Sequence, residues 1–314
     1  MKLPVELQFI ENARLPQRTT TARLDGHICI ITGATSGVGY HAARRLAQAG
    51  AQLILVCRNP QKTSAVKMEL EQESHTRVEI VLADFSRMDE VRQAAATILD
   101  NYPHLDVLIN NAGVHMLRRT LTEDGFETVF AVNHLASFLF TRLLLDRLLA
   151  SAPARVIQVN SQGHRFGGLN LNDLTWKKRP YLGLLGYGAS KTAQLFTVWE
   201  FAAALQGSGV TINAMHPGSV RTNIGMNNWL PYRLYNRFIL RHFLKDPIIS
   251  GEAIYYLAVA PEMKDVSGKF FNLTIEEVPA PHTWNRERGK QVWQISEQLT
   301  GLEPLKKTKQ KESP

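Results

Sequence analysis

The stretch that decides the fold is "HICIITGATSGVG", residues 27–39. Its first half is an uninterrupted apolar run of the kind that forms a strand buried on both faces. Its second half places Gly33, Gly37 and Gly39 just before a helical pattern. A glycine-rich turn between a strand and a helix lets the backbone approach a pyrophosphate at the helix N-terminus. The stretch therefore predicts a dinucleotide-binding loop, with a plain tight turn as the alternative.

The rest of the chain continues this alternation of strand and helix. Its strands do not alternate in polarity, which is typical of a parallel sheet covered on both faces, and neither a linker nor an internal repeat interrupts them. We predict an α/β fold with one doubly wound Rossmann-type domain over residues 26–301. The other expected parts are an irregular arm at 1–25, a helical lid inserted at about 222–248, and a disordered basic tail at 302–314.

Three elements carry more specific predictions. A long helix is expected over roughly 123–150, where apolar residues recur at helical spacing. The segment "GKFFN", residues 268–272, indicates a short strand at the edge of the sheet. Residues 227–244 are expected to form a helical excursion.

The end of the second strand selects the cofactor. A site for NAD usually places an acidic residue about 20 residues beyond the glycine loop, where it binds the ribose 2′-hydroxyl. Here the sequence has "VCRN", in which Arg58 is followed closely by Lys62. A guanidinium binds a 2′-phosphate through paired hydrogen bonds, so NADP(H) is favoured, and a plain surface arginine is the alternative. Asp84 ends the third strand, where it either accepts from the adenine amino group or caps a helix.

Composition excludes several classes of protein. The net charge is +8, but no nucleic-acid-binding motif accompanies it, so no nucleic-acid partner is expected. Cys29 and Cys57 both lie in apolar runs, which indicates reduced buried thiols rather than a disulfide framework. Neither a signal-peptide pattern nor a run of about 18 uncharged apolar residues is found. From these features we expect a cytoplasmic protein without a metal site.

Tyr187 and Lys191, in "YGASK", project from one face of a predicted helix because they are four residues apart. Alone, the pair is an ordinary solvated one. It belongs, however, to an ordered set that begins with "TGATSGVG" and continues with "NNAG" (110–113), Asn133 in "VNHL", Ser161 in "VNS", "YGASK" and "HPGSVRT" (216–222). This set resembles the short-chain dehydrogenase/reductase family over about residues 26–275. Within that family, "LVCRNPQK" and "LTEDGFETVFAVNHLASFLFTRLLLD" resemble the retinol dehydrogenase-like group.

The resemblance implies an NADP(H)-dependent enzyme that interconverts an alcohol and a carbonyl by hydride transfer. In that reading Tyr187 gives a proton to the carbonyl oxygen and Ser161 orients that oxygen. Lys191 lowers the pKa of the phenol and holds the nicotinamide ribose, and Asn133 holds a water that joins Lys191 to solvent. The cofactor-binding residues implied are Gly33, Thr35, Ser36, Gly37, Val38, Gly39, Arg58, Lys62, Asp84, Asn110, Ala112, Gly113, Tyr187, Lys191, Pro217, Gly218 and Thr222.

Some features near this set depart from the family pattern or do not enter its chemistry. Asn160 precedes Ser161 where the family commonly has serine. Members of the group often carry an N-terminal membrane segment, and no such segment is found here. His164 and His216 are near the site, but the Tyr–Lys pair already fills the role of acid and base.

The expected substrate is a hydrophobic aldehyde or ketone, such as retinal, or the corresponding alcohol. In the lid, Arg233, Arg237, Arg241 and Lys245 recur every four residues beside apolar side chains. We favour a solvated basic face there, and a surface that meets an anionic membrane is the alternative. Two other functions stay open: an NADP(H)-binding regulatory protein without turnover, and a reductase of C=C bonds with the same fold. By analogy with the family, a homodimer through the long fourth and fifth helices is expected.

Overall fold

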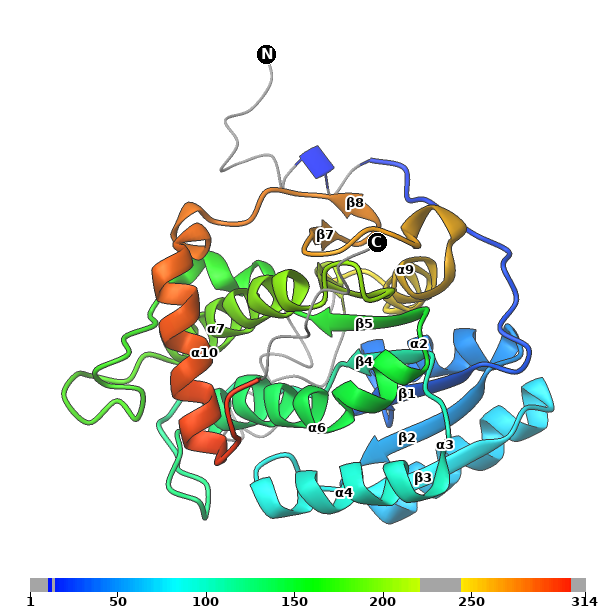
Figure 1. Ribbon diagram of the computed structural model, residues 1–314, viewed down its shortest axis with the longest axis horizontal. Coiled ribbons are helices and arrows are strands. Elements are labelled where there is room, and N and C mark those ends of the chain that lie inside the picture. The colour runs from blue at the N-terminus through cyan, green and yellow to red at the C-terminus, as the bar shows by residue number, and fades with distance from the viewer. Residues whose placement is uncertain (1–10, 13–14, 221–243, 306–314) are drawn as a thin grey trace, which may run out of the picture.

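The computed structural model describes residues 11–12, 15–220 and 244–305. An eight-stranded sheet with the order β3-β2-β1-β4-β5-β6-β7-β8 lies between two layers of helices (Figure 1). The pairs from β3 through β7 are all parallel. The predicted doubly wound α/β fold is therefore confirmed. Its strand order reverses between β1 and β4, which is where open α/β sheets bind ligands beyond the carboxyl ends of their strands.

The strands are formed by the apolar runs that the sequence analysis identified. In β1 every residue is buried, as expected of a central strand with helices on both faces. The strands span Ile28–Thr32 (β1), Gln52–Cys57 (β2), Val78–Leu82 (β3), Val107–Asn110 (β4), Ala154–Val159 (β5), Val210–His216 (β6), Phe270–Asn272 (β7) and Ile275–Glu276 (β8).

The helices divide between the two faces of the sheet, and each face has its own apolar core. One face is covered by α2 (Gly37–Gln48), α3 (Pro60–Ser74) and α9 (Ile248–Val259). The other is covered by α4 (Met88–Asn101), α6 (Ala136–Ala150), α7 (Gly183–Ala204) and α10 (Arg286–Thr300). Short helical segments complete the described chain: α5 (Thr128–Phe130), η2 (Ala131–Leu135), η3 (Gln162–Phe166), η5 (Pro261–Met263) and η6 (Pro281–Trp284).

Helix α10 packs across α7 and α6, as Figure 1 shows. The ring of Trp293 meets Phe138 and Phe201 edge-on, with ring centroids 5.0 Å and 4.6 Å apart. Arg142 on α6 pairs with Glu297 on α10, and both side chains are almost fully buried. Removing one partner of a buried ion pair leaves the other charge unpaired and away from water, which strongly destabilises the fold. Helix α10 is therefore an integral part of the domain.

Two predicted elements differ from those observed. The long helix begins at Thr128 rather than 123, because the Glu127 carboxylate accepts from the backbone N–H groups of Val129 and Phe130 and caps the helix there. The helix then passes through a π-helical stretch, η2, which carries Asn133. The last three residues of "GKFFN" form β7, but β7 is not the edge strand. The edge strand is β8, which pairs with β7 in the antiparallel direction.

Some predictions lie mainly or wholly outside the described residues. The lid predicted at about 222–248 is described only from residue 244 onward, and its arginine stripe lies outside the described ranges. Thr222 and most of the predicted basic tail are likewise outside them. Within the predicted arm, residues 15–25 have no regular secondary structure, and Gln17 accepts from the Thr274 backbone N–H at 3.0 Å.

Candidate active site

The glycine loop forms a concave turn between β1 and α2. Gly33 has a φ of +70°, which favours glycine, and a Cβ on Gly39 would lie 2.5 Å from the Gly33 carbonyl oxygen. Ser36 is the N-cap of α2, yet its side chain makes no capping hydrogen bond. The first turn of a twelve-residue helix therefore keeps N–H groups that its cap side chain does not satisfy. A phosphate fits such a turn.

Asn111 holds this loop in place, and the sequence analysis missed it. Its side-chain amide donates to the carbonyl oxygens of Thr32 and Gly33, at 2.8 Å and 3.1 Å. In return the Thr32 hydroxyl accepts from the backbone N–H groups of Asn111 and Ala112, both at 2.9 Å. The "NNAG" segment thus braces the phosphate loop across β1 and β4. The available signal was "NNAG", of which only Asn110, Ala112 and Gly113 were predicted to bind the cofactor.

A single cleft of about 990 Å³ extends from the loop across the carboxyl ends of the strands. Its volume and its glycine-lined entry suit a dinucleotide. The predicted residues that line it are Gly33, Thr35, Ser36, Val38, Gly39, Arg58, Lys62, Asp84, Ala112, Gly113, Ser161, Tyr187, Lys191, Pro217 and Gly218. Gly37, Asn110 and Asn133 do not line it. Asn110 is buried at the end of β4, where its amide donates to the Thr141 hydroxyl.

The end of the cleft near β2 carries the basic residues. Arg58 and Lys62 are both exposed, and Lys62 lies in the first turn of α3, where its backbone N–H donates to the Asn59 side chain. Asp84 lies opposite and accepts from the backbone N–H of Ser86 at 2.9 Å. This hydrogen bond closes a local turn and does not cap a helix, because the N-cap of α4 is Arg87. Asp84 lines the cleft, and its contact with the adenine amino group stays a prediction.

Tyr187 and Ser161 meet at the other end of the cleft. Burial raises the pKa of Tyr187 to about 12, and a hydrogen bond with the Ser161 side chain acts in the opposite direction. Gly163 makes room for the phenol, because a Cβ there would lie 2.6 Å from the Tyr187 ring. The ring of His115 packs edge-on against Tyr187, with centroids 5.4 Å apart. The phenol is therefore fixed in position from two sides.

Ser161 is held by the residues around it. Its hydroxyl accepts from the Gly163 N–H at 3.0 Å, and its own N–H donates to the Asn160 side chain at 2.8 Å. The Ser161 carbonyl oxygen lies 2.7 Å from Nδ1 of His164, whose Nε2 accepts from the Ala280 N–H at 3.0 Å. Since Nε2 accepts, Nδ1 carries the hydrogen.

Neither histidine near the site acts as a base in this arrangement. Burial lowers the pKa of His164 to about 4, and both of its ring nitrogens are engaged with backbone groups. Burial also lowers the pKa of His216 to about 3. Both imidazoles are neutral at pH 7, and the geometry of His164 suits a role in support of Ser161.

Lys191 is buried beneath the Tyr187 ring. Burial lowers its pKa from 10.5 to about 7, and its Nζ lies 5.6 Å from the centroid of the phenol ring. The Nζ donates to the Val159 carbonyl oxygen and to the Gln194 side chain, each at 3.0 Å. Sequence reasoning expected the ammonium to lower the pKa of the phenol. The shift in the structure is in the opposite direction, because burial raises the pKa of Tyr187.

Asn133 lies behind this pair, on the π-helical stretch. Its Oδ1 accepts from the Val114 N–H at 2.8 Å, and its Nδ2 donates to the Val114 carbonyl and the Ser190 hydroxyl. Its side chain therefore ties the segment after β4 to α7, which carries Tyr187 and Lys191.

A glycine loop at a strand–helix junction, joined by one cleft to a half-buried tyrosine and a buried lysine, defines a dinucleotide-binding oxidoreductase of the Rossmann type. The profile of the short chain dehydrogenase family matches residues 27–232. The chain belongs to this family.

Retinol dehydrogenases are among its relatives. Human retinol dehydrogenase 13 is 37% identical over 300 residues, which cover 94% of this chain and 90% of the relative. Mouse retinol dehydrogenase 12 is 36% identical and covers 91% and 90% of the two chains. Zebrafish WW domain-containing oxidoreductase is 36% identical over 88% of this chain and 69% of its own length. The resemblance to the retinol dehydrogenase-like group is confirmed.

Solved structures agree with this assignment. A crystal structure of an uncharacterized protein from Mycobacterium paratuberculosis has a TM-score of 0.72 and 31% identity, and it covers 92% of this chain and 100% of its own. A short chain dehydrogenase from Shigella flexneri complexed with NADP has a TM-score of 0.64 and 25% identity over 81% of this chain and 99% of its own.

The comparisons also correct one prediction. The cytoplasmic location, which was predicted in part from buried thiols, is wrong, because the relatives are membrane-associated retinol dehydrogenases. Thiols that are shielded from solvent say little about the compartment that surrounds them. Among the described residues one helical stretch, Thr128–Ala150, is long and apolar enough to cross a membrane. It is weak support for a membrane location, since 83% of its most apolar 18 residues are buried inside the domain.

Proposed function

We propose that this protein is an NADP(H)-dependent oxidoreductase that interconverts a hydrophobic alcohol and its aldehyde or ketone with Ser161, Tyr187 and Lys191. The observation that carries the proposal is that Ser161, Tyr187 and a buried Lys191 line the same cleft as the glycine loop, with Lys191 Nζ 5.6 Å from the centroid of the phenol ring. When bound, a reduced nicotinamide cofactor supplies the hydride. The residues of this chain position the carbonyl and supply the proton.

Each residue has one task in the reduction. The Ser161 hydroxyl donates a hydrogen bond to the substrate carbonyl oxygen and orients it. The Tyr187 phenol then gives its proton to the same oxygen as the oxygen becomes an alcohol. The Lys191 ammonium stabilises the phenolate left behind, since a positive charge lowers the pKa of a nearby phenol. The low pKa of Lys191 means that even a modest gain in negative charge beside it favours its protonated form.

The preference for NADP(H) rests on the basic end of the cleft. Arg58 and Lys62 both line that end, and both side chains are exposed to solvent. The residues available to bind a 2′-phosphate are thus two cations rather than the carboxylate that suits a free ribose hydroxyl. The NADP complex of the Shigella flexneri relative supports the same cofactor.

A hydrophobic substrate is supported by an exposed apolar patch of three residues, Phe166, Leu182 and Leu184, on the segments next to Tyr187. These side chains expose 52%, 57% and 55% of their surfaces. The three belong to η3 and the start of α7, the segments that also carry or contact Tyr187. The names of the relatives make retinal the first carbonyl to test.

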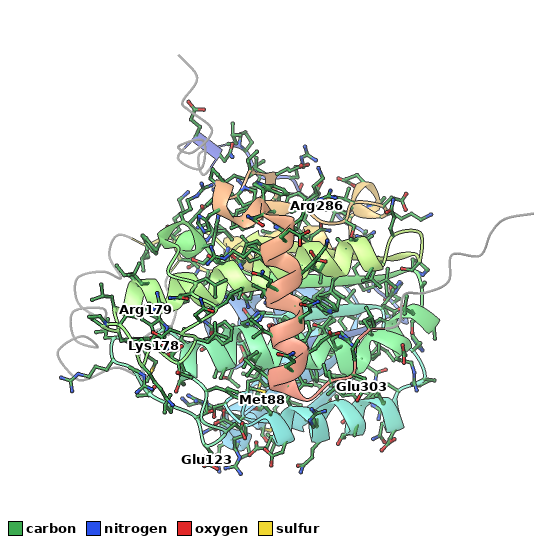
Figure 2. All side chains as sticks on the ribbon, turned by 60° about the vertical axis from the view of Figure 1, so that its left-hand side comes forward. Met88, Glu123, Lys178, Arg179, Arg286 and Glu303 are labelled. Carbon is green, nitrogen blue, oxygen red and sulfur yellow. The ribbon has the colours of Figure 1, made fainter. Side chains whose placement is uncertain are left out.

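We further propose that this apolar patch meets lipid. Lys177 and Lys178 are exposed a few residues before Leu182, and Arg119 from the neighbouring segment donates to the Thr175 carbonyl oxygen at 2.5 Å. Figure 2 shows Lys178 and Arg179 together at one border of the molecule. Basic side chains beside exposed apolar ones suit an anionic lipid surface from which an apolar substrate is drawn.

A homodimer through the long helices stays a prediction, and α10 bears directly on it. Because α10 packs on α7 and contacts α6, part of the surface expected to pair is already covered within one chain. Light scattering of the purified protein measures the mass. A dimer would have to use the surface that α10 leaves open.

Consumption of NADPH over a panel of carbonyls tests the function. Retinal, a long-chain aldehyde, a short soluble aldehyde and an enone should be compared at equal concentration. Turnover of the apolar aldehydes supports the proposal. Tight NADPH binding without any turnover would favour the regulatory alternative, and reduction of the enone at its C=C bond would favour the other.

A further inference from the structure

Gln194 is a buried amide that contacts both Lys191 and Asn133. It lies on α7, less than one turn beyond Lys191, and exposes 1% of its surface. Its Oε1 accepts from Lys191 Nζ at 3.0 Å and from the Asn160 amide at 3.1 Å. Its Nε2 donates to the Asn133 backbone carbonyl oxygen at 2.5 Å.

The orientation of this amide is fixed by its partners. An ammonium can only donate and a carbonyl can only accept, so the Gln194 oxygen must face Lys191 and its nitrogen must face Asn133. Asn133 and Asn160 are also buried, with 0% and 2% of their surfaces exposed. Turning the amide over would leave several buried polar atoms without partners, which is costly away from water.

The link between Asn133 and Lys191 therefore runs through a side chain. The family resemblance implied a water that is held by Asn133 and joins Lys191 to solvent. In the structure the Asn133 carbonyl oxygen accepts from Gln194 Nε2 and from the Ser137 hydroxyl at 2.8 Å. Two donors use the two lone pairs of that oxygen. An amide in the bridging place holds Lys191 but does not exchange protons with solvent as a water does.

Asn160 extends the same network to the catalytic serine. Its amide donates to the Lys191 carbonyl oxygen at 2.9 Å and to Gln194, while its oxygen accepts from the Ser161 N–H. The residue that departs from the family pattern before Ser161 is thus a direct partner of Gln194. The two amides together connect the backbone of Ser161 with the ammonium of Lys191.

We propose that Gln194 is a positioning residue for the reaction, in that it holds the Lys191 ammonium by its oxygen and replaces solvent between Lys191 and Asn133. The inference rests on the proposed function, because it concerns how Lys191 supports Tyr187. The Gln194 and Val159 oxygens are the two protein acceptors that favour a charged lysine in a buried place. Loss of the Gln194 oxygen makes the charged form of Lys191 less stable. The phenolate of Tyr187, which that charge stabilises, then becomes less stable as well.

The test is the pH dependence of kcat for alcohol oxidation at saturating NADP⁺, in Gln194→Met and Gln194→Glu. Methionine has similar length and no hydrogen bond, so less of Lys191 is charged. A glutamate keeps Lys191 charged but cancels its field at the phenol. Both variants should move the limb on which activity rises with pH upward by about one unit, with kcat at pH 7 reduced about tenfold. Thr197→Val, which removes another buried hydroxyl from α7, is the matched control and should leave the limb in place.

The outcomes separate the inference from the function beneath it. If wild-type protein oxidises no alcohol, the proposed function fails. If wild type is active and both Gln194 variants keep the wild-type limb, the positioning role is wrong, even where kcat falls as in Thr197→Val. If Gln194→Met does not fold, Gln194→Glu decides alone, since its shape matches glutamine.

Discussion

The two ends of the cleft recognise charge in opposite ways. At the end near β2, Arg58 and Lys62 are exposed and are available to a ligand from solvent. At the other end Lys191 exposes 4% of its surface, and its ammonium is bonded to Val159 and Gln194. The first end is a set of surface cations, while the second is a buried network in which each hydrogen-bond partner is specified.

This difference separates binding from chemistry. An exposed cation contributes through one ligand contact, and its loss leaves the rest of the fold unchanged. A buried amide or ammonium acts through its neighbours, because an unpaired polar group is costly away from water. Substitutions at the first end should therefore change cofactor affinity. Substitutions at the second end should change rates, pH profiles and stability.

The largest effect is expected at Tyr187. Tyr187→Phe should fold and bind NADPH, yet lose at least about a hundredfold in kcat/KM for carbonyl reduction, because the proton donor is removed. Steady-state kinetics and a NADPH-binding titration measure the two quantities. Tyr102→Phe is the control, because Tyr102 is a partly buried tyrosine that does not line the cleft. This variant should keep its activity. Near-normal turnover in Tyr187→Phe would remove the tyrosine from its role.

The next effect concerns the exposed end. Arg58→Ala should weaken NADPH binding about ten- to hundredfold, the value of one charge-assisted hydrogen bond of about 1.5–3 kcal/mol. NADH binding should hardly change, because NADH lacks the 2′-phosphate. Arg77→Ala, at an exposed arginine paired with Glu79, serves as the control. Equal losses for NADPH and NADH would mean that Arg58 acts through general structure.

The third effect is on stability and belongs to the buried end. Lys191 has a pKa of about 7 in the folded protein against 10.5 ordinarily, so between these values the unfolded chain binds more protons. Stability of the cofactor-free protein should therefore rise with pH over that range, by at most about 1.4 kcal/mol per pH unit from this group. Below pH 7 the group adds no further change. Burial of Tyr187 acts only above pH 10, its ordinary value.

Lys191→Met isolates this contribution. Urea unfolding of both proteins at pH 7, 8 and 9 gives the free energy of unfolding, and the wild type should gain on the variant as the pH rises. Parallel curves would mean that Lys191 titrates as it does in an unfolded chain, and that its burial has no electrostatic consequence.

The smallest effect is expected at the exposed apolar patch of Phe166, Leu182 and Leu184. Replacing Leu182 and Leu184 by serine should raise KM for a long-chain aldehyde supplied in anionic vesicles by about threefold, since apolar contact with the lipid is lost. KM for a short soluble aldehyde should not change. Met68→Ser, at an apolar residue exposed on α3, is the control. An equal rise for both aldehydes would place the leucines in substrate binding rather than lipid contact.

The sequence predicted one end of this cleft better than the other, for a physical reason. The glycine loop is a local feature whose spacing and position between strand and helix are visible in thirteen consecutive residues, 27–39. The buried network depends on pairs that are distant along the chain: Asn160 and Gln194 are 34 positions apart, and Gln194 and Asn133 are 61 apart. No periodicity or motif announces such a pair. Asn160 was noticed only as a departure, and its partner was found only in the structure.

Helix and sheet boundaries show the same limit. The helix start at Thr128 depends on the Glu127 cap, which the prediction of a start at about residue 123 did not take into account. The two-residue strand β8 is too short to leave any pattern at all. Both positions are decided by individual hydrogen bonds rather than by composition.

Transfer of a labelled hydride examines the catalytic end most directly. NADPH carrying deuterium at the transferable position of nicotinamide C4 is incubated with the protein and a long-chain aldehyde, and the product is analysed by mass spectrometry. The Ser161–Tyr187–Lys191 arrangement predicts a primary alcohol that carries deuterium on the former carbonyl carbon. It is one mass unit heavier than the alcohol formed with unlabelled NADPH. The same incubation with Tyr187→Phe should give at most about one hundredth of that product. Unchanged aldehyde with wild-type protein, or deuterium on any other carbon, would contradict the proposed reaction.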